Sequence, residues 1–166
     1  MSEIAVTNVV FAGLGGQGVL KASDILADAA FTAGLDVKKA EIHGMSQRGG
    51  SVTSDVRFGE QVNSPMVPAG EADYLVVLSE DQIENNRHAL KDGGVLIEPT
   101  AINVDDLENK RSLNVALLGV LSVRFDIAQE HWETAIRKNL KDKVHEVNLR
   151  AFAAGCEVGA AAKAQL

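Results

Sequence analysis

The chain is poor in the residues on which several classes of protein depend. Its 166 residues include one cysteine, Cys156, which has no partner for an internal disulfide and cannot supply the four thiolates that an iron–sulfur cluster usually takes. Three residues are proline and 4% are aromatic, so we expect a core of Val, Leu, Ile and Ala, typical of helices packed on a parallel sheet. No His, Cys, Asp and Glu residues stand at metal-ligand spacing, which predicts no metal site.

Positive charge and long apolar runs are also scarce. The net charge is −7, and no basic stripe with interleaved aromatics occurs, which argues against a nucleic-acid partner or an anionic membrane surface. No apolar run approaches the roughly 20 residues that cross a bilayer. The first residues, MSEIAVTN, lack the basic and then apolar layout of a signal peptide. The sequence therefore predicts a cytoplasmic protein with no membrane partner.

The hydrophobic pattern predicts strands alternating with helices along one domain, residues 1–166. Ser79 and Gln82 fit a capping box, so we expect a helix from Ser79 to about residues 91–94. The alternation indicates an α/β fold with a mostly parallel sheet and an antiparallel excursion around 51–62. Strands are expected at 4–12, 36–42, 51–58, 74–78 and 95–98, and further helices at 18–34, 114–125, 127–140 and 147–166.

Residues 13–18, GLGGQG, join the first strand to the first helix with the spacing G-x-G-x-x-G. Gly13 would form the tight turn, Gly15 would let the backbone approach a ligand, and Gly18 would let helix and strand pack closely. The helix N-terminus beyond them attracts anions, which favours a phosphate or nucleotide site. The alternative is a tight turn, including Gly16, that permits close approach of another chain segment or a partner. The Gln17 amide would bond the loop itself or a docked molecule.

The dinucleotide fingerprint also needs an acidic residue about 20 positions further on, at the end of the second strand. Glu41 stands near that place, but IHGMSQRGG follows where the ribose site should be completed. Both interpretations of the glycine loop therefore stay open.

A second loop follows the strand at 36–42 and concentrates polar side chains where ligands bind in open α/β sheets, beyond the carboxyl ends of the strands. Arg48 offers a planar fork for a carboxylate or phosphate, and His43 titrates near neutrality, so both are candidate catalytic residues. Alternatively, Arg48 pairs with a carboxylate of its own domain and His43 caps a strand end. No nucleophile elbow surrounds Ser46, which argues against a hydrolase. The candidate residues of this loop are His43, Gly44, Ser46, Gln47, Arg48, Gly49 and Gly50.

These segments together resemble a known family. GLGGQG, HGMSQRGG, SVTSDVRFG and ADYLVVL are similar to the gamma subunit, or gamma domain, of 2-oxoacid:ferredoxin oxidoreductases, and HGMSQRGG most resembles the indolepyruvate branch. NVALLGVLS, HWETAI and VNLRAFAAG match the family's later layout. The resemblance spans about residues 6 to 159, and segment 101–114 is shorter than usual in the family. It implies a Rossmann-like three-layer sandwich.

The resemblance implies the oxidation of a 2-oxo acid, here indolepyruvate or another aryl pyruvate, to acyl-CoA, carbon dioxide and reduced ferredoxin. This chain lacks the G-D-G and distant Asn pattern of thiamine enzymes and the cysteines for clusters. The resemblance therefore implies an accessory subunit that is inactive alone and binds no cofactor by itself. A larger partner would carry thiamine diphosphate, Mg²⁺ and iron–sulfur clusters, and ferredoxin would be contacted only indirectly.

On this interpretation the glycines of both loops, with Gln17, Ser46, Gln47 and Arg48, expose backbone and side chains to the partner subunit or to coenzyme A at a shared site. Two alternatives remain. One is a stand-alone Rossmann-like nucleotide-binding protein or reductase with its site at Gly13–Gly18. The other is a homo-oligomeric scaffold, of which a homodimer is the simplest form.

Overall fold

The computed structural model describes residues 5–43 and 50–165, and of His43 the backbone alone. It contains an open five-stranded sheet with strand order β2-β3-β1-β4-β5. β1 pairs parallel with β4, and β4 pairs parallel with β5. β3 runs antiparallel to both of its neighbours, β1 and β2, so it is the predicted antiparallel excursion. The strands are β1 (Val6–Leu14), β2 (Asp36–His43), β3 (Ser51–Gly59), β4 (Ala72–Val77) and β5 (Leu90–Ile97).

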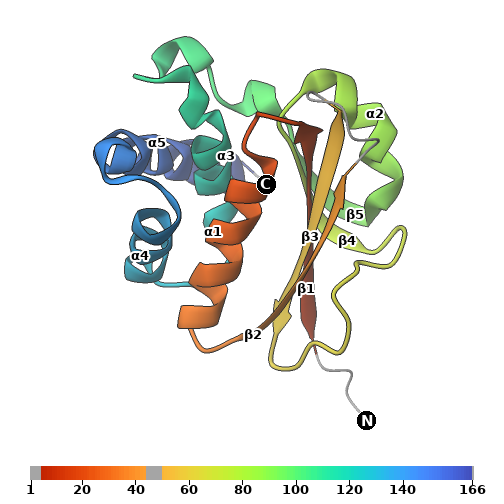
Figure 1. Cartoon of the computed structure of the whole chain (residues 1–166). Helices are drawn as coiled ribbons and strands as arrows, with labels where there is room; N and C mark the ends of the chain where they lie inside the picture. The colour runs from red at the N-terminus through yellow and green to blue at the C-terminus, as the bar shows by residue number, and fades with distance from the viewer. Residues whose placement is uncertain (1–4, 44–49, 166) are drawn as a thin grey trace.

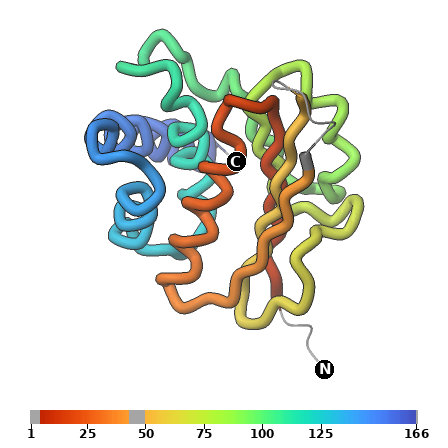
Figure 2. The backbone as a smooth tube through the Cα atoms, in the orientation of Figure 1, coloured from red at the N-terminus to blue at the C-terminus, as the bar shows by residue number. Residues whose placement is uncertain are grey.

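The helices form layers on the two faces of this sheet (Figures 1 and 2). On one face lie α1, α3, α4 and α5, and on the other lies the short α2 with the 3₁₀ turns on either side of it. The predicted α/β three-layer fold is confirmed, although the second helical layer is thin. The helices are α1 (Val19–Thr32), α2 (Ile83–Asn86), α3 (Leu113–Ser122), α4 (Gln129–Asn139) and α5 (His145–Ala164).

β1 is buried on both faces because it lies in the centre of the sheet. Phe11 points into the larger core beneath the four helices, where Trp132 and Ile136 of α4 are also fully buried. Val10 points into the smaller core, which Ile83 closes on the opposite face. A strand between two such layers is apolar where both of its faces are covered, which explains the apolar run Val9–Ala12.

Three glycines bring α3 and α5 into backbone contact. A Cβ atom added at Gly155 would lie 1.9 Å from the carbonyl oxygen of Ala116, and one added at Gly119 would lie 2.2 Å from that of Phe152. Gly159, one turn after Gly155, faces the carbonyl of Val120 in the same way. The close crossing fixes the position of α3, and α3 begins beside the glycine loop described below.

Between Ser79 and residue 94 the prediction was wrong. The Ser79 hydroxyl donates to Asp81 instead of capping the first turn. The side chain of Gln82 is buried and accepts a hydrogen bond from Ser51 of β3. Two 3₁₀ turns and the four-residue α2 replace the expected helix, and β5 begins at Leu90. The Glu80–Ala89 segment is short because it covers only the narrow apolar strip formed by β4 and β1.

No helix in the described part of the chain is both long and apolar enough to span a bilayer.

Candidate functional site

The glycine loop and the described ends of the second loop, the backbone of His43 and Gly50, lie at one edge of the sheet. β1 and β2 run in the same direction because both are antiparallel to β3, and Leu14 and His43 lie opposite Ser51 and Val52. The amide of Gly15 donates a 2.9 Å hydrogen bond to the carbonyl of Gly50. The predicted location of the glycine loop, at the carboxyl end of β1, is therefore confirmed, and β2 ends at His43 on the same edge. Gly44, Ser46, Gln47, Arg48 and Gly49, and the side chain of His43, lie outside the part of the chain that the structure describes.

Gln17 closes the glycine loop with its own side chain. The amide of Leu14 donates to Oε1 of Gln17 at 2.8 Å, and the amide of Gln17 donates back to the carbonyl of Leu14 at 3.1 Å. A Cβ atom at Gly13 would lie 2.8 Å from that Oε1, so Gly13 makes room for the folded-back side chain. Of the two roles expected for Gln17, bonding of the loop itself is confirmed. Its Nε2 has no hydrogen-bond partner among the described residues, which leaves one donor for another molecule.

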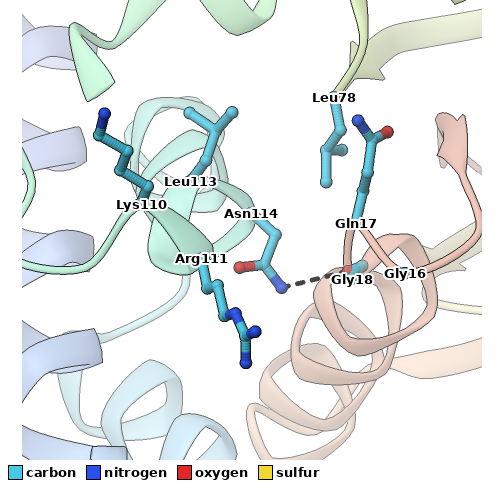
Figure 3. A pocket seen from close by; sticks show the side chains of 8 residues that line it. All are labelled: Gly16, Gln17, Gly18, Leu78, Lys110, Arg111, Leu113 and Asn114. Atoms are coloured by element: carbon cyan, nitrogen blue, oxygen red, sulfur yellow. Dashed lines mark hydrogen bonds between the residues drawn. The ribbon is translucent and has the colours of Figure 1, made fainter. Parts of the chain in front are cut away.

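Gly16 and Gly18 are required by the backbone. Their φ angles are +91° and +86°, in the left-handed region that side chains rarely adopt. Gly18 is also crowded, because a Cβ atom there would lie 2.3 Å from Nδ2 of Asn114. That nitrogen donates a 3.2 Å hydrogen bond to the carbonyl of Gly18, so the start of α1 is held by α3 (Figure 3). Gly18 thus allows close packing against α3, whereas packing of α1 on the strand was expected.

A cleft of about 570 Å³ lies beside the glycine loop (Figure 3). Its walls come from Gly16–Gly18, from Leu78 at the end of β4, and from the turn that leads into α3. This turn contributes Lys110 and Arg111, and the first turn of α3 contributes Leu113 and Asn114. Residues almost 100 positions apart in the sequence therefore line one cavity.

The cleft has a positive character. The N-terminus of α1 faces the glycine loop with no acidic residue in its first turn, so its partial positive charge is uncompensated by the helix itself. Lys110 is exposed and lies 3.5 Å from the exposed carboxylate of Asp105, a pair that contributes little in water. Arg111 has no ion-pair partner among the residues that the structure describes, and its backbone amide is fixed by the side chain of Asn109. The arrangement favours an anionic ligand or an acidic partner surface.

A third loop completes this edge. The hydroxyl of Ser51, the first residue of β3, donates to Oε1 of Gln82 at 3.0 Å. The amide of Leu78 donates to the carbonyl of Ala12 at 2.9 Å, so the end of β4 lies beside the end of β1. Hydrogen bonds thus join the glycine loop to Gly50 and the Ser79–Gln82 turn to Ser51, and the chain just before the turn is bonded to β1. We call this described set, the glycine loop, Gly50–Ser51 and the Ser79–Gln82 turn, the carboxyl edge.

The strand order argues against the dinucleotide interpretation. That fingerprint places its acidic residue on the strand next to β1, but here β3 separates β2 from β1, so Glu41 lies one strand too far away. Glu41 is also engaged, because Lys39 lies 2.9 Å from its carboxylate. Burial alone would lower the pKa of Lys39, but its bonds to Asp24 and Glu41 raise it.

The described residues include no group of three His, Cys, Asp or Glu side chains arranged to hold a metal ion.

Sequence reasoning missed Lys110, Arg111 and Asn114. Lys110 and Arg111 lie between the strand expected at 95–98 and the helix expected at 114–125, and the structure folds that stretch into successive 3₁₀ turns before α3. The available signal was the pair of adjacent basic residues directly before the long apolar run of α3. Only the tertiary packing of α3 on α5 brings that pair to the glycine loop.

Comparisons with a family model, with curated relatives and with solved structures all point to the same family. Residues 8–105 match the model of the pyruvate ferredoxin/flavodoxin oxidoreductase family. The chain is 35% identical, over 190 aligned positions, to indolepyruvate oxidoreductase subunit IorB of Thermococcus kodakarensis, covering 89% of this chain and 93% of that one. It superimposes on the keto/oxoacid ferredoxin oxidoreductase gamma subunit of Geobacter sulfurreducens with a TM-score of 0.77 and 25% identity, covering 93% of this chain and 99% of that one.

A 2-oxoglutarate:ferredoxin oxidoreductase of Magnetococcus marinus, solved with 2-oxoglutarate, coenzyme A and succinyl-CoA bound, shares the fold. The TM-score is 0.83 at 20% identity, and the match covers 96% of this chain and 32% of that longer one.

The chain therefore belongs to the pyruvate ferredoxin/flavodoxin oxidoreductase family, and the predicted resemblance to its gamma subunits is confirmed. The alignment to the Thermococcus subunit is longer than the 166 residues of this chain, so that relative carries additional residues. Their placement at 101–114 stays a prediction.

Proposed function

We propose that this chain is an accessory, gamma-type subunit of a thiamine diphosphate-dependent 2-oxoacid:ferredoxin oxidoreductase. All 166 residues form one gamma-type domain, and a larger subunit carries thiamine diphosphate, Mg²⁺ and the iron–sulfur clusters. The assembled enzyme converts a 2-oxo acid to acyl-CoA and carbon dioxide and passes the electrons to ferredoxin. The name of the Thermococcus relative supports indolepyruvate, or another aryl pyruvate, as the substrate.

The carboxyl edge carries this proposal. The glycine loop, Gly50–Ser51 and the Ser79–Gln82 turn are held by the Gly15–Gly50, Ser51–Gln82 and Leu78–Ala12 hydrogen bonds, so the described residues of this edge present one fixed surface. Gly16 is exposed on this surface, and apart from its two chain neighbours no atom of the described residues lies within 4 Å of the position its Cβ would take. A partner backbone can therefore approach closely there. The sequence of this chain supplies one cysteine, so cluster ligands must come from another chain.

The cleft beside the glycine loop is the part of this surface that suits coenzyme A. A volume of about 570 Å³ accommodates part of a large ligand, and Lys110 and Arg111 provide cations for phosphate groups. The N-terminus of α1 adds unpaired amide hydrogens and a favourable dipole. We propose that coenzyme A binds across the interface, with its phosphates on this chain and its thiol directed toward the thiamine subunit.

Co-expression with the thiamine-type subunit encoded by the same organism tests assembly and activity together. We expect one complex that oxidises an aryl pyruvate with coenzyme A, and no activity from either chain alone. Elution of the two chains as separate species would contradict the proposal. Micromolar binding of NAD, NADP, FAD or ATP by this chain alone would instead support the stand-alone nucleotide-binding alternative.

The coenzyme A assignment has its own test in the same complex. In the variant Lys110→Gln/Arg111→Gln we expect the KM for coenzyme A to rise roughly tenfold or more while the KM for the 2-oxo acid is unchanged, because a lost charged contact is worth about 1.5–3 kcal/mol. The control is Lys141→Gln/Lys143→Gln, which removes equal charge at exposed positions between α4 and α5. An equal rise of the KM for coenzyme A in both variants would mean that only net charge matters. An unchanged KM in both would contradict a coenzyme A site in this cleft.

A further inference from the structure

A second cleft opens at the other end of the sheet, away from the carboxyl edge. It has a volume of about 350 Å³. Thr7, near the start of β1, and Phe58, near the end of β3, lie opposite each other in the sheet and form one wall. Leu35, after α1, and the Arg124–Ile127 corner after α3 form the others. The functional proposal above makes no use of this cleft.

The apolar wall of the cleft is aromatic and pre-formed. The ring of Phe125 contacts that of Phe58 edge to face, with centroids 5.1 Å apart and planes at 84°. The same ring contacts Tyr74 edge to face at 5.2 Å. Phe125 is therefore held from two sides, and because Phe58 is only 5% exposed, the half-buried ring of Phe125 is the fixed surface on which a flat apolar group can pack.

Arg124 brings a charge to this apolar cleft. The residue is half-buried, and its guanidinium has no carboxylate within 4 Å among the residues that the structure describes. Asp126 lines the same cleft but is exposed and forms no ion pair with it, and Glu98 lines the neighbouring cleft that Arg124 also borders. The C-terminus of α3, two residues before Arg124, offers a partial negative charge but no planar acceptor pair.

We propose that this cleft binds a small organic carboxylate with an aryl body. The carboxylate would accept two parallel hydrogen bonds from the fork of Arg124, and the aryl group would pack on Phe125, which Phe58 supports from behind. Size decides between the two clefts that Arg124 borders. The 350 Å³ cleft lies within the range of roughly 300–1,000 Å³ usual for ligand sites, whereas the 230 Å³ cleft beside Glu98 lies below it.

Titration of the full chain with phenylacetate tests the site, with 2-phenylethanol as the uncharged analogue. We expect saturable binding of phenylacetate that shifts the amide resonances of Phe58, Phe125 and Ile127, and binding of the alcohol at least about tenfold weaker, because a hydrogen bond to a charged group contributes about 1.5–3 kcal/mol. Arg124→Gln should weaken phenylacetate binding by a similar factor. Arg124→Lys, which keeps the charge but loses the fork, should fall between the two.

The control is Arg111→Gln, which removes a basic side chain from the cleft at the opposite end and should leave phenylacetate binding unchanged. Resonance shifts confined to the glycine loop, equal binding of acid and alcohol, or no saturation up to the solubility limit would each overturn the proposal. If Arg124→Gln unfolds, the wild-type resonance map and the comparison of acid with alcohol still decide it. Failure here leaves assembly with a thiamine subunit untouched, because the two sites share no residue.

Discussion

Gln17 has two roles in this structure, and substitution can separate them. Its Oε1 accepts the amide of Leu14 at 2.8 Å, while its Nε2 has no partner among the described residues and lies on the cleft. Gln17→Ala removes the acceptor and leaves the partly buried amide of Leu14 unpaired, which costs about 1–2 kcal/mol. In a chain of this length 1 kcal/mol corresponds to about 2–4 °C, so Tm should fall by about 2–8 °C.

Gln17→Glu keeps the acceptor and changes only the cleft side of the group. A carboxylate oxygen can still accept from Leu14, and the negative charge lies near the N-terminus of α1, where it contributes about 0.3–1 kcal/mol. We therefore expect the Tm of Gln17→Glu to equal or slightly exceed that of the wild type, while the affinity of the assembled enzyme for coenzyme A falls.

Thermal unfolding followed by circular dichroism measures the first effect, and the KM for coenzyme A measures the second. An unchanged Tm for Gln17→Ala would refute the closure of the loop by this side chain. An equal loss of stability in Gln17→Glu would refute the separation of its two roles.

Two further predictions concern stability. Gly155→Ala should lower the free energy of unfolding by about 1–3 kcal/mol, since its Cβ would lie 1.9 Å from the backbone oxygen of Ala116. The reverse change on the exposed side of α5, Ala160→Gly, should cost only the difference in helix propensity, about 1 kcal/mol. A rise in stability of Gly155→Ala in urea unfolding would contradict the close crossing of α3 and α5. Burial raises the pKa of Asp55 above its ordinary 3.8, against the opposing bond from the amide of Val67, so ionisation weakens the fold as the pH rises through that raised pKa. Asp55→Asn should then be more stable than the wild type at pH 7 and lose that advantage toward pH 3.8 and below. A difference in the free energy of unfolding between the two proteins that stays constant over this pH range would contradict the prediction.

Elements with a strong local pattern were predictable from the sequence. β1 and β4 carry continuous apolar runs, Val9–Ala12 and Tyr74–Val77, in the centre of the sheet. The sequence of β3 alternates with a period of two, and Val56 and Phe58 are buried on one face as expected, although Asp55 on the other face is buried as well. The glycine loop was placed correctly at the carboxyl end of β1. The strand order was not predictable, because no local sequence pattern indicates that β3 inserts between β1 and β2. That insertion is the observation that argues against the dinucleotide interpretation.

Features that depend on distant partners were missed. The Ser79 capping box failed because Gln82 is taken by Ser51, more than 30 positions earlier. Gly155 and Gly159 stand one helical turn apart in a run of small residues, and their purpose is visible only beside α3. Lys110 and Arg111 acquire a role only when α3 is packed, because the glycine loop they face comes from the first strand and helix.

The most direct measurement of the central claim compares two matched glycines in assembly with the thiamine-type subunit. Gly16 and Gly34 have nearly equal φ angles, +91° and +93°. Among the described residues, chain neighbours aside, neither has an atom within 4 Å of its Cβ position, but Gly16 lies at the carboxyl edge and Gly34 at the far end of α1. Gly16→Gln and Gly34→Gln should lose similar stability, about 1–2 kcal/mol each, because both force a side chain into the left-handed region. With stability matched, we expect Gly16→Gln to abolish or strongly weaken co-purification with the larger subunit and Gly34→Gln to leave it intact. Equal assembly of both variants would contradict the carboxyl edge as the docking surface.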